Sequence, residues 1–212
     1  QNDLPTGCCN ILVSPDGERT MATHIGIGSQ LHPDELNEDS LQGIDHIYME
    51  SYLWDHDLTK QTLKKVGKIA KTMNIETSLS LSDPFCVDRH RDELKEFIEE
   101  YVDLVFCNFD EAKMFTQSET MADVSSFFQS FGKKIAMTAS AEGAYFFQGE
   151  TVAHQPAQKI EQVIDTTGAG DNFAAGFLDQ YLSDKTIDEA LAQGNARAGE
   201  VIQQLGPRIK RH

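Results

Sequence analysis

The fold is decided by one stretch of the chain, Val163-Ile-Asp165-Thr-Thr-Gly168-Ala-Gly170-Asp171-Asn-Phe-Ala-Ala-Gly176-Phe-Leu178. This stretch predicts a strand, a tight turn of small residues and then a helix. A dinucleotide fingerprint would require glycine where Phe173 stands, and a P-loop would require a Gly-Lys-Ser or Gly-Lys-Thr ending that is absent. The spacing therefore disfavours both a P-loop and an oxidoreductase of the Rossmann type.

The start of the predicted helix is a candidate anion site. The N–H groups of residues 168–171 lack intrahelical partners there, and the helix dipole adds partial positive charge. Phosphoryl transfer needs one group that orients or deprotonates the attacking hydroxyl and others that hold the phosphoryl oxygens. Asp171 suits the first role, and Gly168, Ala169 and Gly170 suit the second. The alternative is that Asp171 only stabilises its helix and that the glycines only permit close packing.

Strands and amphipathic helices alternate through the rest of the chain. Buried strands are expected at residues 44–49, 77–81, 104–107 and 134–138. Apolar residues at helical spacing separate them, which predicts an α/β fold with a mostly parallel sheet. Antiparallel hairpins are expected at residues 8–13 with 19–23 and at residues 144–147 with 151–154.

The two ends of the chain differ in character. Thr186 and Glu189 form a capping-box pair, and the apolar positions that follow predict a last helix through Leu205, ended by Gly206-Pro207. The other end is a polar segment that leads into a hairpin without a strand and helix before it. We therefore expect a natural ending at the C-terminus and a missing region at the N-terminus.

The charge and length of the chain limit its function. With 212 residues, one main core is expected. The 34 acidic and 18 basic residues give a net charge of −16, which argues against binding to a nucleic-acid backbone. A phosphate site in such a protein must be built locally, from backbone N–H groups, a cation and one or two arginines.

The cysteines and the hydropathy indicate a cytoplasmic protein. The four cysteines, Cys8, Cys9, Cys86 and Cys107, contain no C-x-x-C pair, so we expect reduced thiols. No apolar run approaches the length of a membrane span, and the first residues do not resemble a signal peptide. The seven histidines show no metal-ligand spacing.

The stretch Asp165-Thr-Thr-Gly-Ala-Gly-Asp171-Asn-Phe-x-x-Gly176 resembles the second signature of the PfkB, or ribokinase-like, carbohydrate-kinase family. This long signature implies a three-layer α/β/α fold with a mostly parallel central sheet and a small β lid. It further implies ATP as the phosphoryl donor, Mg²⁺ as a cofactor and Asp171 as the catalytic base.

Two more segments agree with the family in their order along the chain. Asn108-Phe-Asp-Glu111 is similar to the N-x-x-E motif, which implies that Glu111 organises Mg²⁺ through water and that Asn108 lies near the phosphates. Thr138-Ala-Ser140-Ala-Glu-Gly143 resembles the T-x-G-x-x-G segment that borders the nucleotide, with Ser140 where glycine is usual.

Four further residues carry implied roles with an alternative for each. Asp165 and Thr167 match positions that bind an activating K⁺ in many members, or they cap the turn. Asn195 falls where the family lines the adenine pocket, or it is solvated on its helix. Arg19 matches an arginine that can reach the phosphates, or it faces solvent from its strand.

The adenosine-kinase branch of the family is favoured by three segments: Pro5-Thr-Gly-Cys, Val13-Ser-Pro-Asp-Gly-Glu-Arg-Thr-Met21 and Leu81-Ser-Asp-Pro-Phe85. The resemblance covers the chain but leaves out the family's N-terminal region, with its acceptor-binding segment. We expect a partial β lid at residues 1–30, a kinase core at residues 31–212, and a homodimer through the lid strands.

The function that these features imply is ATP-dependent phosphorylation of a primary hydroxyl of a sugar or nucleoside, with adenosine-like acceptors favoured. The alternative is a non-catalytic nucleotide-binding fragment or pseudokinase that lacks the acceptor side. Neither hypothesis involves nucleic acid or a membrane.

Overall fold

The computed structural model describes residues 4–17 and 19–209. Six strands form the central sheet, in the order β3-β4-β5-β6-β7-β8. Their bounds are β3 His46–Glu50, β4 Glu76–Ser80, β5 Leu104–Asn108, β6 Lys134–Thr138, β7 Ala144–Gln148 and β8 Thr151–Gln155. Strands β3 to β6 are parallel, and β7 and β8 add an antiparallel hairpin at one edge. The predicted α/β architecture and the edge hairpin are confirmed.

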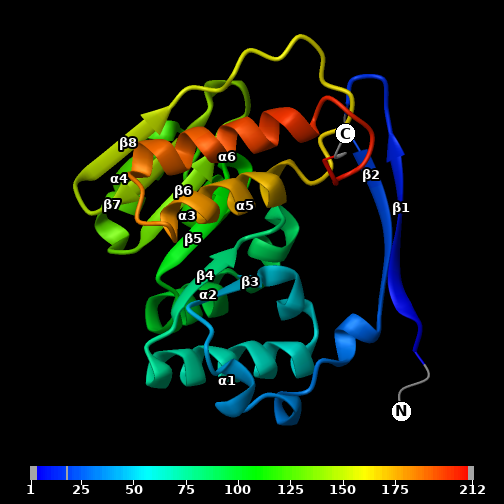
Figure 1. Cartoon of the computed structure of the whole chain (residues 1–212), viewed down its shortest axis with the longest axis vertical. Helices are drawn as coiled ribbons and strands as arrows, with labels where there is room; N and C mark the ends of the chain where they lie inside the picture. The colour runs from blue at the N-terminus through cyan, green and yellow to red at the C-terminus, as the bar shows by residue number, and fades with distance from the viewer. Residues whose placement is uncertain (1–3, 18, 210–212) are drawn as a thin grey trace.

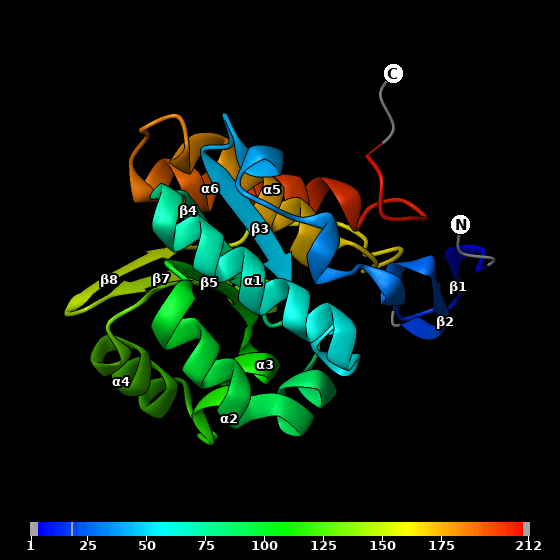
Figure 2. The same cartoon turned by 90° about the horizontal axis from the view of Figure 1, so that it is seen from below.

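Helices cover both faces of this sheet, so the fold has three layers (Figure 2). The helices are α1 Asp57–Met73, α2 Pro84–Tyr101, α3 Phe109–Thr116, α4 Met121–Phe131, α5 Ala169–Tyr181 and α6 Ile187–Val201. Helices α5 and α6 lie on one face, and α1 to α4 lie on the other (Figure 2). The capping box predicted at Thr186 and Glu189 is present at the start of α6.

Two hydrophobic cores fill the spaces between the layers. The first contains Trp54, Leu79 and Phe128 on the side of α1 to α4. The second places Phe106 of β5 against α5, with an edge-to-face contact to Phe177 at 5.5 Å between ring centroids. Each such buried side chain stabilises the fold by roughly 1.5–3 kcal/mol. The second core therefore fixes the axis of α5, whose first turn belongs to the glycine-rich stretch.

A two-stranded antiparallel sheet stands apart from the central sheet, at one side of the molecule (Figure 1). It consists of β1 Thr6–Val13 and β2 Arg19–Gly26, which extends the predicted hairpin by a few residues at its open end. Most of its residues are exposed. The division of the chain at residues 1–30 and 31–212 stays a prediction.

Two local expectations were wrong. Residues 163–165 form no strand, because the N–H groups of Ile164 and Asp165 both donate to Ile202 O rather than to a strand of the sheet. Helix α6 ends at Val201 instead of Leu205, because the chain turns there and brings Gly206 N to the Asp165 carboxylate at 2.8 Å. Both differences bring the C-terminal segment against the glycine-rich stretch.

A polar network spans the end of the sheet where the parallel strands begin. Glu76 Oε1 accepts hydrogen bonds from Lys134 Nζ at 2.9 Å and from Tyr181 OH at 2.6 Å. His46 Nε2 pairs with Ser78 Oγ at 2.8 Å. The other ring nitrogen of His46 is buried without a hydrogen-bond partner among the described residues, 3.8 Å from Glu76 Oε2.

This burial predicts a pH-dependent stability. Burial lowers the pKa of His46 below 6.5, and this effect outweighs the charges of Glu76 and Asp103, which raise it. The folded state then binds fewer protons than the unfolded state, so stability falls as the pH drops below about 6.5. The variant His46→Gln should lose less stability than the wild type between about pH 7.5 and about pH 5.5.

Urea unfolding at the two pH values measures this difference, and His56→Gln, at an exposed position, is the matched control. Equal losses in the wild type and in His46→Gln would contradict the expectation.

Candidate functional site

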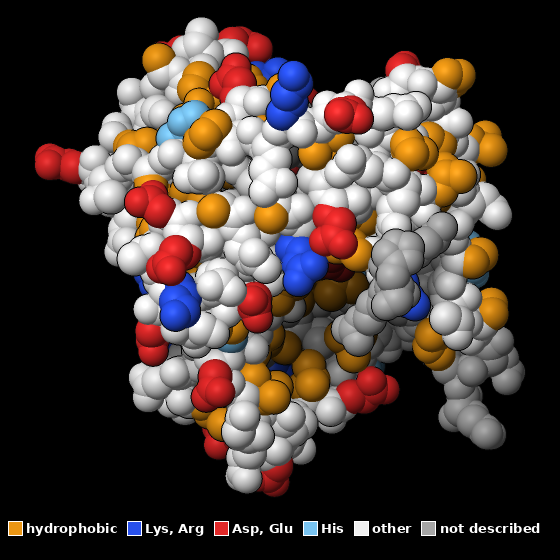
Figure 3. All heavy atoms as spheres, turned by 45° about the horizontal axis from the view of Figure 1, so that its top comes forward, with side chains coloured by type: hydrophobic (Ala, Val, Ile, Leu, Met, Phe, Trp, Pro, Cys, Tyr) orange, Lys and Arg blue, Asp and Glu red, His pale blue; other side chains and the backbone are white. Residues whose placement is uncertain are grey.

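A cleft of about 850 Å³ lies between the hairpin β1–β2 and the carboxyl ends of the parallel strands. Figure 3 shows the molecule hollowed between its body and the hairpin, with hydrophobic side chains inside the hollow. This position agrees with the rule that open α/β sheets bind ligands at the carboxyl ends of their strands. Of the site residues predicted from the sequence, the cleft is lined by Arg19, Asn108, Glu111, Thr138, Thr167, Gly168, Gly170 and Asp171.

The glycine-rich turn presents backbone N–H groups to this cleft. Gly168 is the N-cap of α5 with φ 77°, a conformation that favours glycine, and no side chain caps the helix there. The N–H groups of Gly168, Gly170 and Asp171 have no acceptor within the described residues. The expectation for Ala169 was wrong, because its N–H donates to Thr166 O at 3.2 Å. The free N–H groups of this turn therefore belong to the residues on either side of Ala169, and their role as an anion site stays a prediction.

Asp165 holds this turn in shape. Its Oδ1 accepts from the N–H of Thr167 at 2.9 Å and also from the Thr167 hydroxyl, and its Oδ2 accepts from Gly206 N. Burial alone raises the pKa of Asp165, but the hydrogen bonds from Thr167 and Gly206 outweigh it and hold the pKa below its usual value. In this structure Asp165 caps the turn, and its role in K⁺ binding stays a prediction.

Asp171 differs from Asp165 in its surroundings. Its carboxylate is exposed to the cleft and accepts no hydrogen bond from any side chain that the structure describes. Glu50, at the end of β3, lies close enough for the two charges to interact. Burial and then the charge of Asp171 raise the pKa of Glu50. The first turn of α5 thus holds a carboxylate that is free to act beside free N–H groups.

Asn108 and Glu111 form the capping box of α3. Glu111 Oε2 accepts from Asn108 N at 3.0 Å, and Glu111 Oε1 accepts from Asn108 Nδ2 at 2.7 Å. Asn108 Oδ1 in turn accepts from Glu111 N at 2.8 Å. Burial raises the pKa of Glu111 to about 7. The N-x-x-E motif therefore has a structural role here in addition to any role with a cation.

The cleft suits a magnesium ion that is held through water. Five carboxylates line the cleft: that of Asp55, which is paired with Arg89 and His90, and those of Glu50, Asp83, Glu111 and Asp171. Within the described part of the chain, no three His, Cys, Asp or Glu residues stand close enough to ligate one ion. Mg²⁺ usually keeps several waters and takes only one or two carboxylates beside substrate phosphates. A cation nearby would also offset the desolvation of the buried Glu111 carboxylate.

The segment Thr138–Gly143 continues from the end of β6. Ser140 has φ 49°, so it adopts the left-handed conformation for which glycine is favoured. Gly143 has φ 99°, and a Cβ on it would lie 2.1 Å from Gln155 O. Asn195 approaches the same place, with its Nδ2 donating to Gln155 O at 2.9 Å.

These contacts bring Gly143, in the segment that follows β6, and Asn195 of α6 together at the segment 155–157. None of Ser140, Gly143 and Asn195 lines the cleft itself. Their roles in nucleotide binding stay predictions.

The apolar side of the cleft was not predicted from the sequence. Cross-strand pairing places Cys9 opposite Thr23 and Ile11 opposite Met21, so these residues share one face of the hairpin, and all of them line the cleft. Across from them lies Tyr52, 44% exposed, whose hydroxyl donates to Ser82 O at 3.0 Å. Glu50 and Tyr52 lie at and just after the end of β3. Their place in the cleft follows only from the order of the strands, which brings this end of β3 near Asp171.

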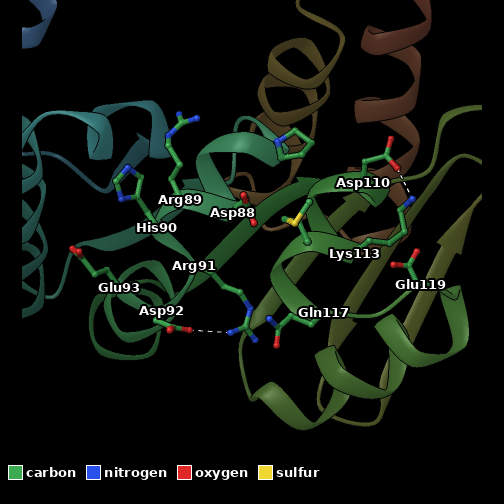
Figure 4. A pocket seen from close by; sticks show the side chains of 12 residues that line it. Asp88, Arg89, His90, Arg91, Asp92, Glu93, Asp110, Lys113, Gln117 and Glu119 are labelled. Carbon is green, nitrogen blue, oxygen red and sulfur yellow. Dashed lines mark hydrogen bonds and ion pairs between the residues drawn. The ribbon is translucent and has the colours of Figure 1, made fainter.

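A second pocket, of about 740 Å³, lies on the outer surface between α2 and α3 (Figure 4). Its basic groups are paired: Arg91 contacts Asp92 at 2.9 Å, and Lys113 contacts Asp110 at 2.8 Å. Because these charges are already compensated by neighbours, we do not assign the pocket to a phosphate-bearing ligand.

The fold and the cleft together define a ribokinase-like α/β protein. The family described as "pfkB family carbohydrate kinase" matches residues 1–211, and the chain belongs to this family. None of the helices in the described part of the chain combines the length and apolar character needed to cross a bilayer.

Known relatives include adenosine kinases. An adenosine kinase of Dictyostelium discoideum is 24% identical over 98% of this chain and 65% of its own length. The crystal structure of an adenosine kinase from Sinorhizobium meliloti is 38% identical, with a TM-score of 0.92 over 96% of this chain and 63% of that one. A probable sugar kinase from Rhizobium etli CFN 42 is 36% identical, with a TM-score of 0.93 over 98% and 64%. The chain thus spans somewhat less than two thirds of these relatives.

The left-handed backbone conformation of Ser140 predicts how substitutions at this position change the stability of the fold. Glycine adopts φ 49° without the steric penalty that a Cβ brings, although it gains entropy in the unfolded chain. Ser140→Gly should therefore be more stable than Ser140→Ala by about 1 kcal/mol. Thermal unfolding of the two variants measures the difference, and an alanine variant as stable as the glycine variant would refute it.

Proposed function

We propose that this protein is an ATP-dependent phosphotransferase that acts on a primary hydroxyl of a nucleoside or sugar. The observation that carries this proposal is the free carboxylate of Asp171 beside the free N–H groups of Gly168 and Gly170 in one cleft. Membership in a family of carbohydrate kinases supports it.

The chain's own residues divide the work of the transfer. Asp171 accepts the proton of the acceptor hydroxyl as the hydroxyl oxygen bonds to the γ-phosphorus of ATP, and the bond from that phosphorus to ADP, the leaving group, breaks. The N–H groups of Gly168 and Gly170 hold the oxygens of the phosphoryl group, on which negative charge must be stabilised. The start of α5 adds the positive end of its dipole. Arg19, which lines the same cleft, supplies a full positive charge.

The proposed cofactors are ATP with Mg²⁺, and K⁺ as an activating ion. ATP supplies the phosphoryl group, while Mg²⁺ neutralises phosphate charge in a protein that is itself acidic. Glu111 is the residue that we propose to hold Mg²⁺ through water, and Asn108 lies beside it at the cleft. Asp165 and Thr167 are the proposed K⁺ residues.

A nucleoside is the acceptor that we favour over a free sugar. The face of the hairpin that looks into the cleft carries Ile11, Met21 and Ile25, and Met21 is 45% exposed. Tyr52 adds an aromatic ring to the same cleft. A planar base would bury this apolar surface, whereas a sugar offers mainly hydroxyl groups. An adenosine-like acceptor also agrees with the adenosine kinases among the relatives.

The alternative function is a nucleotide-binding protein without turnover. It is favoured by the hairpin, whose two strands have no third partner among the described residues. The free edges of this hairpin also support the proposed homodimer. Binding of ATP without phosphorylation of any acceptor would establish the alternative.

The direct test replaces the proposed base. Asp171→Asn should reduce ADP release with ATP, Mg²⁺ and a responsive nucleoside by about 100-fold or more, because a general base is lost. Stability should change little, because no described side chain bonds to the carboxylate. Asp179→Asn, at an exposed position on the same helix, is the matched control. A responsive nucleoside whose phosphorylation survives Asp171→Asn would refute the assigned base.

The two glycines of the turn allow a second test. A Cβ on Gly170 would meet no atom within 4 Å, so Gly170→Ala should fold normally while its methyl group enters the space proposed for phosphate. A Cβ on Gly168 would lie 2.7 Å from Pro207 Cβ, at φ 77°, so Gly168→Ala should lose about 1–3 kcal/mol of stability.

Calorimetric titration with Mg-ATP and thermal unfolding separate the two effects. Gly170→Ala should bind Mg-ATP at least about 10-fold more weakly than the wild type without a loss of stability. Unchanged affinity in this variant would exclude the phosphate site at this turn.

A further inference from the structure

Thr166 joins the hairpin to the glycine-rich turn. Its hydroxyl oxygen accepts a hydrogen bond from Arg19 Nη1 at 2.6 Å and donates to Gly17 O at 3.2 Å. Its backbone N–H donates to the same Gly17 O at 3.3 Å. One residue therefore connects both the turn of the hairpin and the first residue of β2 to the start of the anion site.

Close packing accompanies these hydrogen bonds. Gly17 is buried with φ 84°, and a Cβ on it would lie 3.0 Å from Val163 Cγ1. At the other end of the hairpin, Ile27 N donates to Pro5 O at 2.9 Å, where the chain leaves toward α1. Between these two ends the strands are largely exposed and extend along the cleft. The open end of the hairpin is held where the chain continues toward α1. The contacts of Thr166 hold the opposite end, at the turn.

Arg19 keeps its charge available in this arrangement. No carboxylate in the described part of the chain forms an ion pair with Arg19, although the protein has a net charge of −16. Arg89, another arginine that lines the cleft, donates three hydrogen bonds to Asp55. Arg19 is instead held by a neutral hydroxyl. An arginine that is ordered before its ligand arrives loses less rotamer freedom when the ligand binds.

We propose that Thr166 is a positioning residue: its hydroxyl latches the hairpin turn to the glycine-rich turn and holds Arg19 toward the phosphate groups of the nucleotide. The part that concerns the nucleotide rests on the proposed function, while the latch itself does not. Thr166 acts through Arg19 and is not expected to touch the reacting atoms.

Hydrogen exchange of the ligand-free protein tests the latch without any substrate. Thr166→Val keeps the volume and the backbone hydrogen bond but removes the hydroxyl, and Thr166→Ser retains the hydroxyl as the matched control. In the valine variant, the backbone amides of β1 and β2 next to the turn should exchange about 5-fold faster than in the wild type. In the serine variant, their exchange rates should match those of the wild type. Equal exchange in the wild type and the valine variant would overturn the latch.

Titration with Mg-ATP tests the second half of the proposal. Thr166→Val should weaken binding about 5-fold and Thr166→Ser less than about 2-fold. In the Arg19→Met background, Thr166→Val should cause no further loss, because the hydroxyl acts through Arg19. If Thr166→Val weakened Mg-ATP binding by the same factor in the Arg19→Met background as in the wild type, the proposed role of Thr166 would be overturned. A wild-type chain that binds no Mg-ATP would refute the nucleotide half together with the proposed function, and the exchange experiment would still decide the latch.

Discussion

The buried carboxylate of Asp165 is the constraint on which the rest of the site depends. It lies at 2% exposure and bonds in two directions, to Thr167 in its own turn and to Gly206 beyond α6. A buried carboxylate is tolerated only when donors compensate its lost hydration. The need for these donors draws the C-terminal segment onto the turn, where Pro207 then packs against Gly168. These contacts hold the turn in the conformation in which the N–H groups of Gly168 and Gly170 have no acceptor among the described residues.

The same principle shows how an acidic protein could offer the proposed phosphate site. Apart from Asp171, the carboxylates that line the cleft are either held by hydrogen bonds, as Glu111 is by Asn108, or shifted toward the neutral form, as burial and Asp171 do to Glu50. Positive potential comes from backbone N–H groups and from Arg19, whose partner Thr166 carries no charge. The local field at the turn is thus set by a few oriented groups rather than by the net charge.

The sequence predicted the strands, the edge hairpin and the capping box at Thr186, because each depends on local periodicity or on neighbours three residues apart. It failed at residues 163–165, whose hydrogen-bond acceptor is Ile202, close to forty positions further along the chain. Glu50 was missed for a related reason. A glutamate at the end of a strand carries no signal until the order of the sheet places it near Asp171.

Several motif residues serve the fold as well as the proposed chemistry. Asn108 and Glu111 cap α3, and Asp165 caps its own turn, so replacing any of them would disturb structure and activity together. Asp171 and Gly170 are different: no side chain among the described residues bonds to Asp171, and a Cβ on Gly170 would meet no described atom within 4 Å. Folding and function are therefore separable there, and the chemistry of the cleft is best judged at these two positions.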